Sequence, residues 1–220
     1  MEGDPHSQGD RRPIATRRRK WAQASAAWLA QQNVSPNAIS IAGMFACIVA
    51  GILLALTSIG YCPLEWFAAA VLVQLRLTAN MLDGMVALSS GRASRVGELY
   101  NEIPDRVSDA AVFIGAGFAD GGNVPLGYAA TILSIFTAYV RAAGKIAGAQ
   151  SEFCGPMAKQ HRMLVITVIG LYATIVPRSW LVIHVGQTKV SVISIGLAII
   201  VIGCVVTVFR RLKRIVGALS

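Results

Sequence analysis

The chain has 220 residues, of which 55% are hydrophobic and 14% are charged, and its formal net charge is +9. Soluble domains rarely have so apolar a composition, so we predict a membrane protein. The basic residues lie at the ends of apolar segments and form no continuous patch, which favours a membrane surface over nucleic acid as the partner. The scattered cysteines indicate neither a disulfide framework nor a zinc site, and we expect them to be packing residues: Cys47, Cys62, Cys154 and Cys204.

The N-terminal region has a polar start, a basic run over residues 11–20 and a short mixed segment over residues 21–31. Trp21, Trp28 and several alanines give this segment a weak apolar face, which is typical of a helix that lies in the membrane interface. A disordered basic tail is the alternative interpretation. We expect residues 1–34 to form a cytoplasmic leader with an interfacial amphipathic helix.

Six apolar segments follow, each near the roughly 20 residues that a membrane-spanning helix requires. They are residues 38–60, 64–88, 97–119, 124–147, 163–185 and 190–209. The fifth is interrupted near Pro177, because a proline disrupts a helical pattern. The predicted fold is therefore an all-α membrane protein with six transmembrane helices, in which residues 1–220 form a single domain and residues 35–220 are its six-span core.

The lysine and arginine residues predict the orientation, because they accumulate in cytoplasmic loops. Most of the 20 precede the first span, join the second to the third, flank the connection between the fourth and fifth, or follow the sixth. Arg178 and Lys189 are the two that fall on the opposite side. We therefore expect both termini to face the cytoplasm, in what is most simply a bacterial inner membrane.

Acidic residues gather in the second and third spans and the link between them. They are Asp83, Glu98, Glu102, Asp105 and Asp109. Each ionisable group inside a span costs roughly 2.5–3.5 kcal/mol on insertion scales, so such groups usually have a function. Positions 97, 101, 105 and 109 recur every four residues and share one helix face. A cytoplasmic hairpin would bring this face opposite Asn80 and Asp83, which predicts an oxygen-rich pocket suited to Mg²⁺ or Mn²⁺.

Ion pairing inside the membrane is an alternative explanation for the same carboxylates. Asp105 and Asp109 could pair with Arg76, Arg106 or Arg141. Glu98 and Glu102 could instead be solvated at the end of their helix.

The chain also resembles the CDP-alcohol phosphotransferase family, whose signature is D-x-x-D-G-x-x-A-R, eight residues, then G-x-x-x-D-x-x-x-D. The matching positions are Asn80, Asp83, Gly84, Ala87, Leu88, Gly97, Asn101 and Asp105, with every spacing conserved. Asn80 and Asn101 replace aspartates, and Leu88 replaces the arginine. Segment 35–40 also matches the family's T-P-N-x-x-T entry, and segments 105–110, 139–142 and 155–162 look like those of the branch that uses inositol phosphate.

The resemblance implies roles for individual residues. Asn80, Asp83, Asn101 and Asp105 would hold the divalent ion, with Glu102 or Asp109 as auxiliary ligands. Asp105 would also be the catalytic general base. Gly84, Ala87 and Gly97 would let the nucleotide approach the backbone. Arg141, Lys159 and Arg162 would bind a phosphate of the acceptor, although each could equally reflect membrane topology.

The implied activity is metal-dependent transfer of a phosphatidyl group from a CDP-activated lipid to an alcohol, with release of CMP, in phospholipid biosynthesis. The resemblance and small residues such as Gly144 and Gly148 further predict a homodimer among membrane lipids. A catalytically silent, lipid-binding relative is one alternative, because two aspartates are missing. A small transporter is the other, and it would need polar residues through the outer half of the spans.

Overall fold

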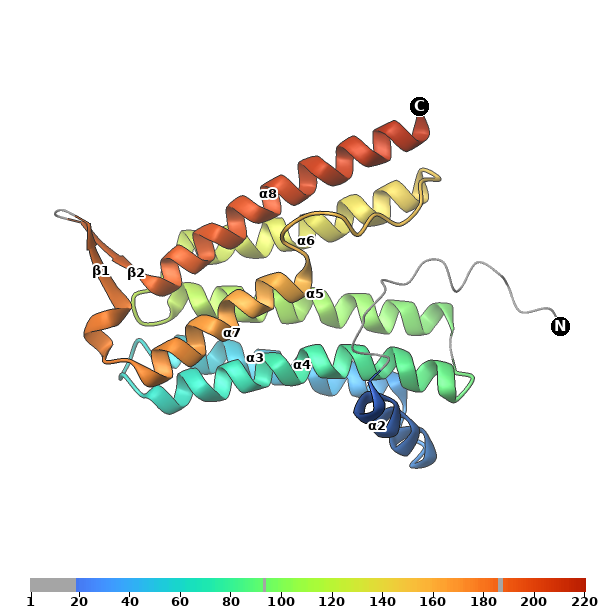
Figure 1. The fold of residues 1–220 in the computed structure, drawn as a ribbon, viewed down its shortest axis with the longest axis horizontal. Coiled ribbons are helices and arrows are strands. Elements are labelled where there is room, and N and C mark those ends of the chain that lie inside the picture. Colours follow the sequence, from blue (N-terminus) through green and yellow to red (C-terminus); the bar gives the residue numbers. More distant parts are fainter. Residues whose placement is uncertain (1–18, 93, 186–187) are drawn as a thin grey trace.

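A computed structural model describes residues 19–92, 94–185 and 188–220, and Figure 1 shows a bundle of long helices with a small hairpin at one end. The helices are α2 (Lys20–Gln31), α3 (Pro36–Leu56), α4 (Pro63–Ser89), α5 (Arg95–Phe118), α6 (Val124–Ile146), α7 (Lys159–Ile175) and α8 (Val192–Leu219), with a short 3-10 helix η2 (Arg178–Leu181). The strands are β1 (Val182–Val185) and β2 (Thr188–Ser191). The predicted all-α class is confirmed, with this hairpin as an addition.

Local sequence signals set where the helices begin. The side chains of Ser94, Asn123 and Ser191 accept hydrogen bonds from backbone N–H groups three residues later, at 2.9–3.1 Å. Such caps satisfy amides that have no partner inside the helix. Pro36 and Pro63 stand at the first helical turn, where the missing N–H costs nothing.

The long helices pack around α3 and α5. Helix α3 packs on α4 and α5, α4 packs on α7, α5 on α6, and α6 on α8. Successive connections alternate between the two ends of the bundle, so that α2 and the end of α8 lie at the same end (Figure 1). The core between the helices is apolar, with Leu54, Trp66, Phe113, Ile166 and Leu197 fully or nearly fully buried.

Four of the described helices are long and apolar enough to cross a membrane, namely α3, α4, α6 and α8. Helix α7 has 17 residues, and α5 carries the acidic and basic residues of the predicted pocket. The chain is thus an integral membrane protein. By length and composition, four of the six predicted spans are established among the described helices.

The fifth predicted span, residues 163–185, is wrong in its second half. Helix α7 ends at Ile175, and Val176 is already extended, with ψ at 153°. Pro177 explains this end, because proline excludes the helical conformation from the residue before it and lacks the N–H that the helix needs. The following residues form η2 and an antiparallel hairpin in which Val182 pairs with Ser191 and Ile183 with Val190.

Two other boundaries differ from the prediction. Helix α7 begins at Lys159, four residues before the predicted start at Met163. Helix α8 continues to Leu219, beyond the predicted end at Phe209. The extension is helical because it is amphipathic, with Arg211 and Ile215 buried on one face.

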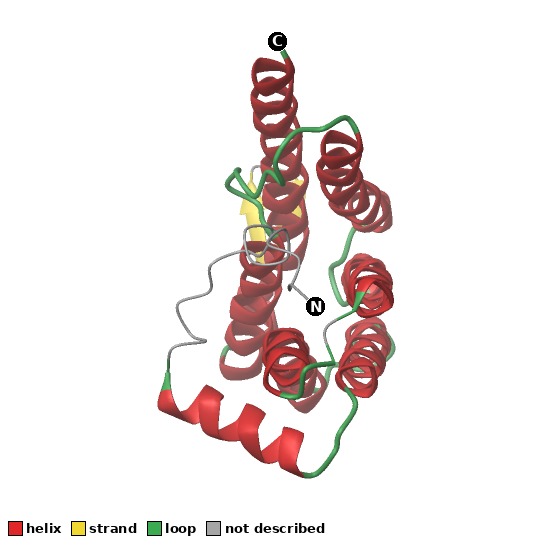
Figure 2. Ribbon diagram, turned by 90° about the vertical axis from the view of Figure 1, so that its right-hand side faces the viewer, coloured by secondary structure: helices red, strands yellow, loops and turns green. Residues whose placement is uncertain are grey.

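Helix α2 confirms that residues 21–31 are helical, and it crosses one end of the bundle (Figure 2). Ala22 and Ala26 are buried, and α2 packs on α4. Trp21 and Trp28 are about half exposed, at 48% and 59%. The basic residues 11–18 lie outside the described residues. All four cysteines lie in the described part of the chain; Cys47 and Cys204 are buried, and Cys62 and Cys154 are half-buried.

Glycines allow two helix pairs to approach closely. A Cβ atom on Gly51 would lie 2.2 Å from the carbonyl oxygen of Ala111, and one on Gly115 would lie 2.2 Å from that of Gly51. In the same way, Gly144 leaves room for Ile215 of α8. Gly144 is therefore used inside the chain, and it no longer supports the predicted dimer.

We expect Gly51→Ala to lower the free energy of unfolding by about 1–3 kcal/mol, because the added methyl group must push α3 away from α5. Gly217→Ala in α8 is the matched control, since nothing lies within 4 Å of its added Cβ atom. Thermal unfolding of both variants in detergent is the measurement. Equal melting temperatures would contradict the close approach of α3 and α5.

Candidate active site

Asp105 of α5 is the centre of a group of charged residues between α4, α5 and α7. Its Oδ1 atom accepts hydrogen bonds from Arg76 Nη2, at 2.6 Å, and from Lys159 Nζ. Its Oδ2 atom lies 3.3 Å from Asn80 Nδ2 and 3.6 Å from Arg106 Nη2. The predicted meeting of the polar faces of α4 and α5 is present, although both helices pack mainly on α3.

Arg76 of α4 is fully buried and fixed by groups of two other helices, α3 and α5. Besides the carboxylate of Asp105, its guanidinium donates to Ser108 Oγ at 3.2 Å and to the carbonyl oxygen of Ser40 at 3.3 Å. Gly43 leaves the space that this side chain fills, because a Cβ atom there would lie 2.9 Å from Arg76 Cδ. The sequence indicated Arg76 as an ion-pair partner, but not that it would fix the candidate catalytic carboxylate.

Asp83 is 4% exposed and has partners of its own. Ser40 Oγ donates to its Oδ2 atom, and the backbone N–H of Gly84 donates to Oδ1 at 2.5 Å. Arg76 and Asp105 lie within electrostatic reach of it. The sequence analysis assigned no role to Ser40. The resemblance of segment 35–40 to the family was the sequence signal that could have placed this residue at the site.

Asn101 has a buried side-chain oxygen without a hydrogen-bond partner in the described part of the chain. Such atoms are rare and call for a ligand, an ion or a water molecule. Among the described residues, no three His, Cys, Asp or Glu side chains are grouped to hold a metal ion. The available donors are two carboxylates, Asp83 and Asp105, and the amides of Asn80 and Asn101. All of these donors are oxygen atoms, which Mg²⁺ and Mn²⁺ prefer as ligands. They supply less negative charge than four aspartates would.

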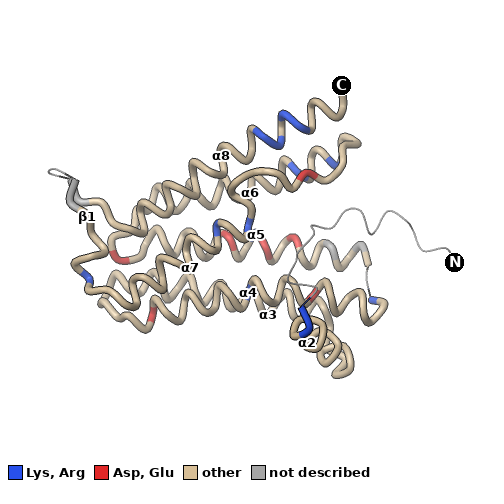
Figure 3. The backbone as a smooth tube through the Cα atoms, in the orientation of Figure 1, with Lys and Arg blue, Asp and Glu red and all other residues tan. Residues whose placement is uncertain are grey.

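The three cations predicted to bind an acceptor phosphate are all paired with carboxylates. Arg141 pairs with Glu102, Lys159 with Asp105, and Arg162 with Asp109 at 2.7 Å. The structure therefore shows the alternative explanation, in which carboxylates and cations pair inside the bundle. The sequence suggested Arg76 as a partner of Asp105, but it did not suggest Lys159 for Asp105 or Arg162 for Asp109. Figure 3 shows acidic and basic positions meeting where α5 passes the start of α7.

The two predicted auxiliary ligands differ in their surroundings. Asp109 is fully buried, and Arg162, its partner, also donates to the carbonyl oxygen of Met157 at 2.8 Å. Glu102 is exposed and contacts Arg141 and Arg106. Asp109 therefore ties α5 to α7 through its Oδ2 atom, while its buried Oδ1 atom has no hydrogen-bond partner among the described residues, and Glu102 lies at the surface of the bundle.

The predicted nucleotide-contacting residues lie at partly exposed positions. Gly84 and Ala87 are half-buried in the last turns of α4, and Gly97 is half-buried near the start of α5. A Cβ atom on Gly97 would make ordinary contact with Ser94 Oγ at 3.4 Å. Gly97 therefore faces no close neighbour in this structure, which is compatible with an approaching ligand.

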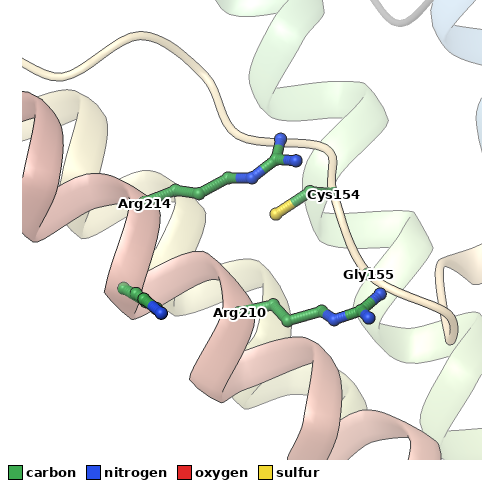
Figure 4. Close-up of a pocket in the computed structure, with 5 residues that line it drawn as sticks. Cys154, Gly155, Arg210 and Arg214 are labelled. Carbon is green, nitrogen blue, oxygen red and sulfur yellow. The ribbon is translucent and has the colours of Figure 1, made fainter.

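A second polar feature, which the sequence analysis missed, is a basic pocket of about 560 Å³ between α8 and the connection from α6 to α7. It is lined by Cys154, Gly155, Arg210, Lys213 and Arg214. The side chains of Arg210 and Arg214 extend toward Gly155 and Cys154 (Figure 4). Burial and a hydrogen bond with Glu152 raise the pKa of the Cys154 thiol, which disfavours its thiolate form.

We expect Arg162→Met to lower the free energy of unfolding by about 3–5 kcal/mol, because it leaves Asp109 as a buried, unpaired charge. Arg141→Met, which breaks a more exposed pair, should cost about 0–1 kcal/mol. Denaturant titration in mixed micelles measures both. Adding Asp109→Asn to Arg162→Met should recover part of the loss. An Arg162→Met protein as stable as the Arg141→Met control would argue that Arg162 acts on substrate instead.

Two known proteins are similar to most of the chain. The inner membrane protein YnbA of Escherichia coli is 27% identical over 151 residues, which cover 69% of this chain and 74% of that protein. The phosphatidylinositol phosphate synthase of Mycolicibacterium smegmatis is 29% identical over 172 residues, covering 74% of this chain and 73% of the synthase.

Solved structures share the fold. The phosphatidylinositol phosphate synthase of Mycobacterium tuberculosis with CDP-DAG bound superimposes with a TM-score of 0.72 at 22% identity, covering 92% of this chain and 98% of that one. The same enzyme with manganese and citrate gives a TM-score of 0.71 at 22% identity, covering 90% and 92%. The profile of the family described as CDP-alcohol phosphatidyltransferase matches residues 33–209, so the chain belongs to that family.

Proposed function

We propose that the chain transfers a phosphatidyl group from a CDP-activated lipid, such as CDP-diacylglycerol, to an alcohol or polyol phosphate, and that it needs Mg²⁺ or Mn²⁺. The observation that carries this proposal is the pair Asp83 and Asp105, buried in a membrane protein of the CDP-alcohol phosphatidyltransferase family. Relatives that act on or bind such compounds, among them a synthase with CDP-DAG bound, support the same substrate class.

The reaction forms one P–O bond and breaks another. The acceptor hydroxyl attacks the phosphorus next to the lipid, the bond to the bridging oxygen breaks, and CMP leaves with the electron pair. Asp105 takes the proton of the attacking hydroxyl. Asn80, Asp83, Asn101 and Asp105 would hold a divalent ion, which neutralises the charge of the diphosphate and makes CMP a better leaving group.

The arrangement of polar groups favours an enzyme over a transporter. The apolar core extends past the charged group toward the hairpin end, with Leu54, Trp66 and Ala116 buried. No route of polar side chains for an ion is therefore evident among the described residues there. A catalytically silent relative is the remaining alternative, and activity measurements decide it.

Arg141 and Lys159 are the proposed ligands of an acceptor phosphate. Each would have to exchange its carboxylate partner for the phosphate, whereas Arg162 is held by Asp109, Thr137 and Met157. These contacts support a packing role for Arg162 ahead of a binding role.

We also propose six spans in a bacterial inner membrane, with both termini and the site facing the cytoplasm and α2 in the interface. The alternation of connections in Figure 1 and the basic residues at the end that carries α2 and the end of α8 support this. Residues 35–220 would form one domain. A homodimer remains a proposal that rests on the family resemblance.

Purified wild-type protein should release CMP from CDP-diacylglycerol when Mn²⁺ and an acceptor from a panel of polyols and their phosphates are present. Asp105→Asn should lower turnover by about 10²-fold or more even at saturating metal, because an amide does not accept the proton. Asp83→Ala should lose both metal binding and the rate of CMP release.

Asn80→Asp and Asn101→Asp should lower the metal concentration that gives half-maximal CMP release. Activity in the doubly restored variant alone would show that the natural chain is silent.

Cysteine labelling tests the orientation. In a background without the native cysteines, a membrane-impermeant maleimide applied to intact cells should label Gly60→Cys, between α3 and α4, and spare Ser89→Cys, at the end of α4. Gly60 suits the probe because nothing lies within 4 Å of an added Cβ atom. The reverse labelling pattern would place the site outside and overturn the proposed access for CDP-lipids.

A further inference from the structure

We propose that Lys159 is an exchangeable counter-cation of Asp105, whose ammonium group competes with the divalent ion for that carboxylate. This inference rests on the proposed function, because it concerns how the same site takes up its metal ion. Without the metal ion, the ammonium group of Lys159 would neutralise the Asp105 carboxylate that the ion would otherwise neutralise.

Cations surround the two carboxylates without a metal ion. Asp83 and Asp105 contribute two negative charges, and Arg76 and Lys159 contribute two positive charges, while Asn80 and Asn101 are neutral. Arg106 adds a third cation, 3.6 Å from Asp105 Oδ2, and it is also paired with Glu102. A buried carboxylate without a positive partner is strongly unfavourable in an apolar surrounding. Because two asparagines stand in place of carboxylates, the positive charges of Arg76 and Lys159 already match those of the two aspartates, and a divalent ion entering this group gains affinity when one positive charge leaves.

Lys159 can leave, whereas Arg76 cannot. Arg76 is fully buried and bonds to groups of α3 and α5. The side chain of Lys159 is 13% exposed, and among the described residues its hydrogen-bond partner is Asp105. A lysine ammonium is a point charge on a flexible stem, so it can turn away without moving the backbone.

The position of Lys159 supports the same conclusion. It is the first residue of α7, next to the connection that follows α6. A positive charge at the start of a helix is unfavourable, because the exposed N–H groups there already carry partial positive charge. Asp105 offsets this cost in the metal-free state. Once displaced, the ammonium would be near the site and available to an anionic substrate.

Manganese binding tests the proposal without depending on turnover. Free Mn²⁺ is followed by electron paramagnetic resonance in detergent-solubilised wild type, Lys159→Met and Lys159→Gln. Both variants should bind Mn²⁺ about tenfold more tightly or better, because an opposite charge beside a carboxylate has effects of at least this size. Lys159→Arg should stay near wild type. Lys20→Met is the matched control, since Lys20 is the first residue of α2, outside the site.

Thermal unfolding provides the second measurement. Without metal, Lys159→Met should melt below wild type, and Mn²⁺ should raise its melting temperature more than that of wild type. Unchanged or weaker Mn²⁺ binding in both Lys159 variants would overturn the exchange while leaving the transferase function intact. Absence of Mn²⁺ binding in wild type and all variants would instead contradict the metal dependence, and the exchange with it.

Discussion

The pairing of Asp105 with Arg76 and Lys159 is the interaction on which the rest of the structure depends. A carboxylate inside an apolar helical bundle is tolerated only with positive partners, and here these come from two other helices. The same pairing ties α5 to α4 and α7. The pair between Asp109 and Arg162, one turn further along α5, connects α5 to α7 a second time. These charge pairs thus hold together the helices that form the site, in addition to the packing of α4 and α5 on α3.

Close backbone packing makes these contacts possible. Gly51 and Gly115 let α3 and α5 touch along their backbones, and Gly43 makes room for the guanidinium of Arg76. Without large side chains at these positions, the polar groups of α3, α4 and α5 come within hydrogen-bond distance. Ser40 shows the result, since it reaches Asp83 through its hydroxyl and Arg76 through its carbonyl oxygen.

The helices from α3 to α6 could be predicted because apolar length, prolines and caps determine them locally. The second half of the fifth segment could not, since Val182, Ile183 and Val190 are as compatible with a buried helix as with a hairpin. Similarly, the four-residue spacing of Asn101, Asp105 and Asp109 predicted a common face. Which cation meets which carboxylate depends on the reach of long side chains across helices, and no local pattern encodes that.

The central claim is that Asn80, Asp83, Asn101 and Asp105 form one site that binds a divalent ion together with the diphosphate of the donor. Calorimetric titration of CDP into protein in lipid nanodiscs, with and without saturating Mn²⁺, tests this most directly. A shared site predicts that Mn²⁺ tightens CDP binding and that CDP tightens Mn²⁺ binding by the same factor, because such coupling is reciprocal. CDP affinity that is independent of Mn²⁺ would contradict the account.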